Sequence, residues 1–312
     1  MAVEAHQATT ENSVLLGPLS ALARQKKTWA PELLAGVVWR GLTNFGVHRR
    51  VLRLLKLPSL AEAARNNPRF AFKYLTHDYL ARGLTTAQRA SCFLHHYRRL
   101  HTALPDLFLR QILRGETLLY EINTGGNRFA VSMGLSRDFD KEGELSLNLH
   151  VDGEIVFLLA FTIVPGAVVE SEASEVLLIS RLQGMKGVYR QVHLATRTLH
   201  NVAPGALLLS VLQGLALAFG IGQIAAVTAL RQSSYTADSA AVFQQAYDEF
   251  FIGLGIPETA AGFFLTPVPI EPKPLAHVKK GHKIRTKEKR AFKQQIQSDC
   301  AAFFAQRIQG PT

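Results

Sequence analysis

The chain has 312 residues, of which 47% are hydrophobic and 19% are charged, so it can form one large domain or two smaller ones. Its two cysteines, Cys92 and Cys300, stand far apart in the sequence and exclude a disulfide framework and a CxxC metal pattern. The first residues include acids and have no basic segment ahead of their apolar run, unlike a signal peptide. We therefore expect a cytoplasmic protein, either free or peripheral at the inner membrane.

The net charge of +11 is distributed unevenly. Residues 21–115 carry 17 Lys and Arg against 4 Asp and Glu, residues 116–272 carry 8 against 16, and residues 273–293 carry 9 against 1. Basic segments on both sides of an acidic centre either clamp that centre or face an anionic partner, for which an anionic ligand, a membrane surface and tRNA are candidates. The predicted regions are a flexible tail (1–17), a basic helical region (18–115), an α/β core (116–272) and a basic C-terminal helix (273–312).

The basic region before residue 115 predicts amphipathic helices. Apolar clusters at 19–23, 37–39 and 51–55 recur at helical spacing, with basic side chains between them. Thr85 and Gln88 have the spacing of a capping box, in which each side chain binds the backbone N–H of the other. A further helix should therefore begin directly after Thr85.

That helix carries a histidine-rich stretch, residues 95–101. Neighbouring residues on a helix point about 100° apart, so His95 and His96 cannot bind one metal ion together. His95 and Arg99 share a face, and no carboxylate is close to them in the sequence. We interpret the stretch as a basic face at the surface or between domains rather than as a metal site.

Strands follow from residue 117 onward. Residues 143–151 alternate between apolar and polar side chains, which predicts a half-buried strand. Asp152 and Gly153 then predict a hairpin turn, and the partner strand is apolar on both faces near its end, which predicts a central position in the sheet. The predicted strands are 118–122, 129–135, 143–151, 154–164, 176–180 and 223–228.

Residues 198–230 contain no Asp, Glu, Lys or Arg. One interpretation is a membrane-spanning helix over residues 205–229, which is long enough to cross a bilayer. The other is a helix over residues 206–219, opened by Pro204 and ended by the glycines that follow it, with a buried strand after them. We favour the second because the segment contains two periodicities and an internal break.

A helix over residues 243–254 and a basic helix over residues 286–308 complete the predicted elements, and Pro257 and Pro267 close the core between them. Together the elements predict an α+β fold. Its centre is a mixed, largely antiparallel sheet with a strand–helix–strand unit. A helical N-terminal region precedes this core, and a basic C-terminal helix closes it.

A basic glycine loop follows the strand at 176–180, and a tyrosine-bearing helix comes near the end of the core. This order resembles that of the GNAT acyltransferases, in which the amides of a glycine loop at a helix N-terminus hold the pyrophosphate of acyl-CoA. Acyl-CoA and aminoacyl-tRNA are therefore the candidate donors. Sixteen residues separate Gly187 from Pro204, so residues 202–205 are an alternative cradle, and a polar loop that only closes the sheet edge is a third interpretation. The candidate donor-binding residues are Arg181, Gln183, Gly184, Lys186 and Gly187.

The helix over residues 243–254 supplies candidate catalytic groups. Tyr247 could protonate a leaving thiolate, and Asp248 or Glu249 could act as a base. Alternatively, Tyr247 is a core residue with its hydroxyl at the rim. The candidate substrate-binding residues, expected at the same edge as the glycine loop, are Thr196, Arg197 and His200.

Several local features follow one another along the chain. They are Phe93 with His96 and Tyr97, Gly143–Glu144 before the alternating strand, Gln183–Gly184, Thr196 with Pro204, Tyr247–Asp248 and the closing basic helix. In this order they resemble the bacterial VirK/YbjX family, also described as the DUF535 domain, from about Ala61 to Phe304. The resemblance implies a Gram-negative bacterial protein linked to virulence and to resistance to cationic antimicrobial peptides, and it implies no reaction. We expect a GNAT-like acyl- or aminoacyltransferase or, alternatively, a non-enzymatic accessory protein that binds a membrane surface or a partner.

Overall fold

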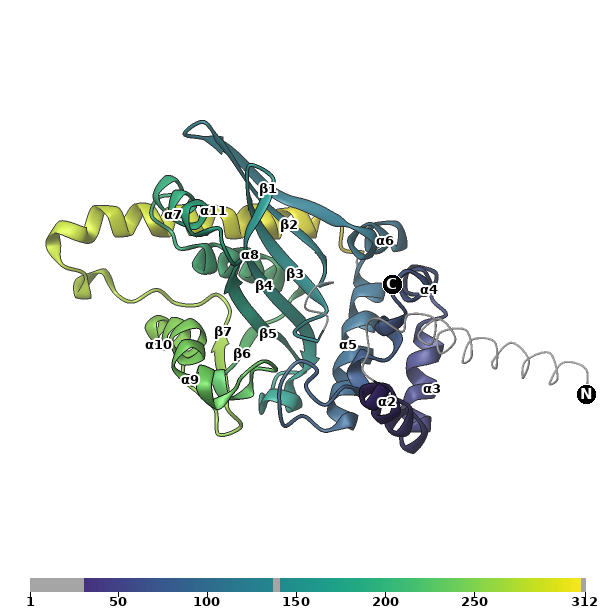
Figure 1. Cartoon of the computed structure of the whole chain (residues 1–312). Helices are drawn as coiled ribbons and strands as arrows, with labels where there is room; N and C mark the ends of the chain where they lie inside the picture. Colours follow the sequence, from purple (N-terminus) through teal and green to yellow (C-terminus); the bar gives the residue numbers. More distant parts are fainter. Residues whose placement is uncertain (1–30, 137–140, 310–312) are drawn as a thin grey trace, which may run out of the picture.

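The computed structural model describes residues 31–136 and 141–309. These residues form a seven-stranded sheet, with N-terminal helices against one face and α8 (Pro204–Phe219), itself covered by α11 (Lys283–Ala305), against the other (Figure 1). The arrangement confirms the predicted α+β class, with its mixed, largely antiparallel sheet between a helical N-terminal region and a closing helix. The strands are β1 (Glu116–Thr124), β2 (Asn127–Leu135), β3 (Leu145–Val151), β4 (Glu154–Pro165), β5 (Glu175–Gly184), β6 (Gln223–Val227) and β7 (Phe263–Pro267).

The helices before the sheet include the one predicted from the capping box. The hydroxyl of Thr85 accepts the N–H of Gln88 at 3.2 Å, and the side chain of Gln88 accepts the N–H of Thr85 at 2.9 Å, which confirms that box. The predicted tail 1–17 and the apolar cluster at 19–23 lie outside the described residues. The N-terminal helices are α2 (Pro31–Thr43), α3 (Phe45–Leu54), α4 (Pro58–Asn66), α5 (Thr86–Ala103) and α6 (Asp106–Arg114).

The strands of the sheet lie side by side in sequence order, so β4 occupies its middle. Residues 158–164 of β4 are all buried, and the predicted central position of this strand is confirmed. The prediction of a half-buried β3 is wrong, because its polar face is covered too. Ser146 and Asn148 are only 7% and 6% exposed, and Asn148 donates to the carboxylate of Glu116 on β1 at 3.0 Å.

Among neighbouring strands of the sheet, β5 and β6 are the parallel pair, and their pairing ends at Ile179, before the end of β5. Leu177, Leu178 and Ile179 pair with β6, whereas residues 181–184 have β4 as their sole strand partner. The other neighbouring strands are antiparallel. The sheet is therefore open between the end of β5 and the end of β6.

The segment without charged residues, 198–230, contains helix α8 and strand β6 rather than one long helix. Helix α8 stops at Gly220, whose φ of +69° suits a residue without a side chain, and β6 follows. Among the described residues, no helix combines the length and the apolar character needed to cross a bilayer. Helix α11 lies closely along α8 at Gly214, where a Cβ would be 2.9 Å from the Cβ of Cys300 and would also meet the Gln297 carbonyl.

Two elements were not predicted: β7 and α7 (Tyr189–Thr198), which lies between β5 and α8. The predicted helix at 243–254 is present in three parts, because a π-helical turn interrupts it. The closing helix starts at Lys283, slightly before the predicted start. The three parts are α9 (Ala240–Phe243), the turn η6 (Gln244–Asp248) and α10 (Glu249–Leu254).

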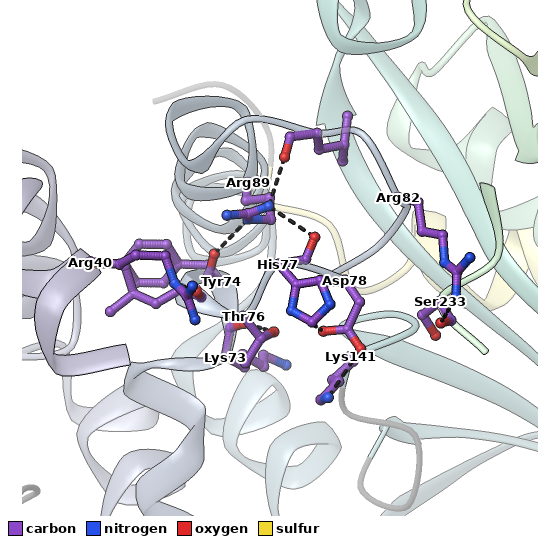
Figure 2. A network of polar contacts seen from close by, with 12 residues as sticks. Arg40, Lys73, Tyr74, Thr76, His77, Asp78, Arg82, Arg89, Lys141 and Ser233 are labelled. Atoms are coloured by element: carbon purple, nitrogen blue, oxygen red, sulfur yellow. Dashed lines mark hydrogen bonds and ion pairs between the residues drawn. The ribbon is translucent and has the colours of Figure 1, made fainter. Parts of the chain in front are cut away.

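The segment that leads into α5, residues 76–84, joins the N-terminal helices to the sheet (Figure 2). Arg89 is 5% exposed, and its guanidinium group donates to the carbonyls of Tyr74, His77 and Leu84 at 3.1, 3.0 and 2.7 Å. The 3.1 Å ion pair between Asp78 and Lys141 joins the segment to the residues just before β3. Arg89 therefore holds this irregular stretch of backbone to α5, and Asp78 links it to the sheet.

Candidate functional site

The predicted glycine loop is mostly strand. Arg181, Gln183 and Gly184 belong to β5 and pair with β4, and only Met185 to Val188 form a turn. Helix α7 starts at Tyr189, directly after this turn. The expectation that sixteen residues separate the loop from the next helix is therefore wrong.

The turn presents the N-terminus of α7 to solvent. Gly187 has a φ of +87°, and the side chains of Lys186 and Arg190 on either side of it are exposed. The first turn of α7 has no acidic residue, and Val188 at its N-cap has no side chain that can bind the first amides. Free first-turn amides and the helix dipole both favour an anion at this end.

Glu142, which lies just before β3, gathers polar side chains where β5 and β6 part. It is 5% exposed, and one of its oxygens forms an ion pair with Arg181 of β5. Its other oxygen accepts the hydroxyls of Ser233 at 2.7 Å and Ser234 at 3.0 Å, both from the segment after β6. Arg181 also donates to Gln183 at 2.6 Å. These five residues form the Glu142 cluster, which brings two predicted residues together around an unpredicted carboxylate.

Tyr247 and Asp248 lie in the π-helical turn η6, a kind of turn that is frequent at functional sites. Tyr247 is 4% exposed, and burial raises the pKa of its hydroxyl, on which the charges of Arg181 and Glu142 act in opposite directions. The turn η6 also packs against β5, the strand that carries Arg181, so Tyr247 lies near the Glu142 cluster. Asp248 instead accepts the N–H of Ala229 at 2.8 Å, and burial raises its pKa despite that hydrogen bond. It anchors the segment that carries the two serines.

The three predicted substrate-binding residues lie towards the opposite end of α7. Thr196 and Arg197 are in its last turn, and His200 follows the helix and contacts Phe292 of α11, with ring centroids 4.7 Å apart. A helix of 10 residues rises about 15 Å, so this end is well separated from Gly187. The fold does not bring these three residues to the Glu142 cluster.

Sequence reasoning missed Glu142 and both serines. Ser233 is 91 positions away from Glu142, so no local pattern joins them. One local signal was available in Gly143, which follows Glu142. A Cβ at Gly143 would lie 2.9 Å from the Cβ of Ala160, so glycine is needed for this segment to approach β4.

The Glu142 cluster and the neighbouring Tyr247 together provide groups that can transfer protons. A carboxylate at hydrogen-bond distance from a hydroxyl can accept its proton, and the phenol of Tyr247 can return one. Ser234 is exposed, so the cluster reaches solvent on that side. The arrangement suits a reaction in which a hydroxyl or an amine is deprotonated.

Glu144 forms a second polar cluster, and this one is sealed. Lys73 pairs with its carboxylate, Tyr79 and Tyr97 each donate a hydroxyl to it, and all four side chains are at most 3% exposed. Burial, followed by the charge of Glu144, raises the pKa of both tyrosines, so their hydroxyls stay protonated and donate. These four residues form the Glu144 cluster, which ties the N-terminal helices to the sheet.

The histidine-rich stretch divides between a surface and the core. His95 and Arg99 share the carboxylate of Glu175 on β5, as expected of residues on one face. His96 is buried, and its Nδ1 accepts the N–H of Ile163 at 3.0 Å. Among residues 31–136 and 141–309, no three His, Cys, Asp or Glu side chains are grouped so that they could hold a metal ion.

No curated protein matches the chain, and no solved structure does so either. A family model matches it over residues 37–301. The match extends from α2 into α11 and includes both glutamate clusters. The chain therefore belongs to the family described as protein of unknown function (DUF535).

Proposed function

We propose that the protein is a GNAT-like transferase of acyl or aminoacyl groups, with its donor bound where β5 parts from β6. The course of β5 is the main support for this proposal. Residues 181–184 have a strand partner on one side only, and the chain then turns directly into α7. A strand edge without a partner strand can accept an extended ligand that carries amides, such as the pantetheine arm of acyl-CoA.

The N-terminus of α7 would hold the phosphates of this donor. Lys186 and Arg190 are exposed beside its first turn, which contains no acidic residue. Glu154 of β4, which accepts the side-chain amide of Gln191 at 3.1 Å, is a carboxylate that contacts this turn. Backbone amides at a helix start and nearby cations are a recurrent way to bind phosphate. The same features suit the phosphate backbone of an aminoacyl-tRNA.

In the proposed reaction, an acceptor amine loses a proton to Glu142 as its nitrogen forms a bond to the acyl carbon of the donor. The bond from that carbon to the thiolate, or to the ribose oxygen in aminoacyl-tRNA, then breaks, and Tyr247 supplies the proton to the leaving atom. Arg181 and the two serines hold the carboxylate in place. The resemblance to the VirK/YbjX family supports an envelope precursor or a peptide as acceptor, in resistance to cationic antimicrobial peptides and in virulence.

Calorimetric titration with acyl-CoA and with aminoacyl-tRNA tests donor binding. Lys186→Ala should weaken the binding of the true donor about tenfold, as expected for one charge-assisted contact. Lys287→Ala, which removes an exposed lysine of α11, should leave that binding unaltered. Glu142→Gln and Tyr247→Phe should keep donor binding and lose turnover. Failure of the wild-type protein to bind either donor would rule out this proposal.

A second candidate function is docking to an anionic membrane surface through the basic segment 273–293. The alternative, that its cations pair with the acidic core, is not what the structure shows: within the described residues none of them forms an ion pair with a carboxylate. Lys279, Lys280 and Lys287 are exposed, as is Ile284 at 74%. Near an anionic membrane, each such cation contributes about 1 kcal/mol.

Flotation with vesicles of phosphatidylcholine, with and without phosphatidylglycerol, tests this second candidate. Binding should require phosphatidylglycerol, weaken with salt, and decrease when Lys279, Lys280 and Lys287 are all replaced by Gln. Replacement of the exposed Lys56 by Gln is the control. Salt-insensitive binding, or equal binding by the triple variant, would contradict it.

A further inference from the structure

A groove of 530 Å³ separates α3 from α5. Val47 of α3 and Ala87 and Leu94 of α5 form an apolar part of the wall, and the other lining residues are polar or basic. The groove lies away from the Glu142 cluster. Glu175, which binds two of its lining residues, is six positions from Arg181 along β5, a distance of about 20 Å in a strand.

One face of α5 supplies most of the lining. Ser91, His95, Arg98 and Thr102 recur every three or four residues, and such residues form one stripe on a helix. The basic face of the histidine-rich stretch is thus a wall of this groove. Arg50 of α3 lies in the opposite wall, so cations from two helices converge on one space.

The groove has an excess of positive charge. Arg50 and Arg98 are exposed, and within the described residues neither guanidinium group forms an ion pair or a hydrogen bond. Arg99 is the third arginine, and Glu175 is the carboxylate that it and His95 share. Both oxygens of Glu175 are in use, one by Arg99 at 2.9 Å and the other by His95 at 3.0 Å.

These contacts fix Arg99 in the wall before any ligand arrives. Besides Glu175, its guanidinium group donates to the carbonyl of Phe219 at 2.6 Å and lies over the Phe219 ring, 5.4 Å from the centroid. Burial alone would raise the pKa of Glu175, but hydrogen bonds from His95 and Arg99 outweigh it and lower that pKa. The carboxylate therefore stays ionised and holds both residues.

We propose that this groove binds a phosphate group. Arg50 and Arg98 bind the phosphate directly, and Arg99, which Glu175 holds in place, adds a fixed positive charge. Guanidinium groups match the oxygens of phosphate in pairs and bind them by charge-assisted hydrogen bonds. The apolar wall accepts the organic part of a phosphate ester. The phosphate belongs either to a small soluble molecule or to a lipid headgroup, and this site is independent of the transferase proposal.

Two arms of one experiment distinguish these sources. Binding of inorganic phosphate is followed by phosphorus NMR, and binding of phosphatidylglycerol-containing vesicles by flotation. The double variant Arg50→Gln/Arg98→Gln should bind the true ligand about tenfold more weakly. Loss in the phosphate arm alone identifies a soluble ligand, and loss in the vesicle arm identifies a lipid headgroup.

The control is Arg53→Gln, which removes another exposed arginine of α3, outside the groove, and should change binding in neither arm. Ser91→Glu is a second variant, which keeps the arginines and places a carboxylate in the wall, and it should weaken the same arm. The proposal is overturned if the wild-type protein binds neither probe. It is also overturned if the double variant binds each probe as tightly as Arg53→Gln does.

Discussion

Glu142 and Glu144 are two residues apart and both are buried, yet the groups around them differ. Every side chain that binds Glu144 is sealed, and two of them are tyrosines from the N-terminal helical region. The partners of Glu142 are not all buried, because Ser234 is exposed to solvent. The difference teaches that two buried carboxylates only two residues apart can have different access to solvent. The partners of Glu144 are all buried, whereas one partner of Glu142 is exposed.

The largest expected effect is on the Glu144 cluster. Lys73→Met should lower the free energy of unfolding by about 3–5 kcal/mol, because it leaves a buried carboxylate without its cation. Urea unfolding followed by circular dichroism measures the loss. The double variant Lys73→Met/Glu144→Gln should recover part of it. If Lys73→Met costs less than about 1 kcal/mol, a value typical of exposed pairs, the sealed character of the cluster is refuted.

The corresponding change in the Glu142 cluster should lower the free energy of unfolding by less. Arg181→Met is expected to lower the free energy of unfolding by about 2 kcal/mol, because Glu142 keeps two serine hydroxyls and water can approach. The same urea titration measures it. Equal losses for Arg181→Met and Lys73→Met would remove the contrast between the two glutamates.

Acid should weaken the sealed region through His96, which is in contact with Tyr97. Burial, and then the charge of Lys73, lowers the pKa of His96 well below 6.5, and its Nδ1 accepts a backbone N–H. Below pH 6.5, His96 is protonated in the unfolded chain but stays neutral in the folded protein. Stability should therefore fall as the pH drops below 6.5, by about 1.4 kcal/mol per pH unit for this histidine, until the pH reaches the lowered pKa.

Urea unfolding at several pH values measures this slope. It should be shallower in His96→Gln, which removes the titrating ring, and unchanged in His193→Gln, which alters an exposed histidine. Identical slopes in the wild-type protein and in His96→Gln would show that His96 is not responsible.

The smallest expected effect concerns the serines. Ser233→Ala should lower the free energy of unfolding by about 0.5–1 kcal/mol, since Ser234 and Arg181 still bind the carboxylate of Glu142. The double variant Ser233→Ala/Ser234→Ala should cost more than the sum of the single changes, because each hydroxyl partly compensates for loss of the other. Chemical denaturation of the three variants provides the comparison, and strict additivity would mean that the hydroxyls act independently.

Most of the sheet and the long helices could be predicted because their apolar residues recur at strand or helix spacing. Helix α7 was missed because Ala195 is its sole buried residue and Val188 at its start is no capping signal. Strand β7 was missed because it has only 5 residues and ends at Pro267, which cannot donate to a ladder. Short or surface elements carry too little periodicity for a single sequence to reveal them.

The candidate site was predictable only in part. Arg181 and Tyr247 stood out because a basic residue near glycines and a tyrosine beside acids suggest chemistry. Glu142 did not, because its partners come from distant segments and meet only when the sheet has formed. The extension of β5 to Gly184 was also missed, since it depends on pairing with β4 rather than on the residues of β5 themselves.

The close packing of α11 on α8 has a consequence for synthesis of the chain. Gly214 meets Gln297 and Cys300, and more than a quarter of the chain separates it from them. Because domains fold as units during translation, the apolar surface of α8 leaves the ribosome well before its cover exists. Nascent chains interrupted in this interval should therefore depend on chaperones, and a stop codon shortly before α11 should yield an aggregating product.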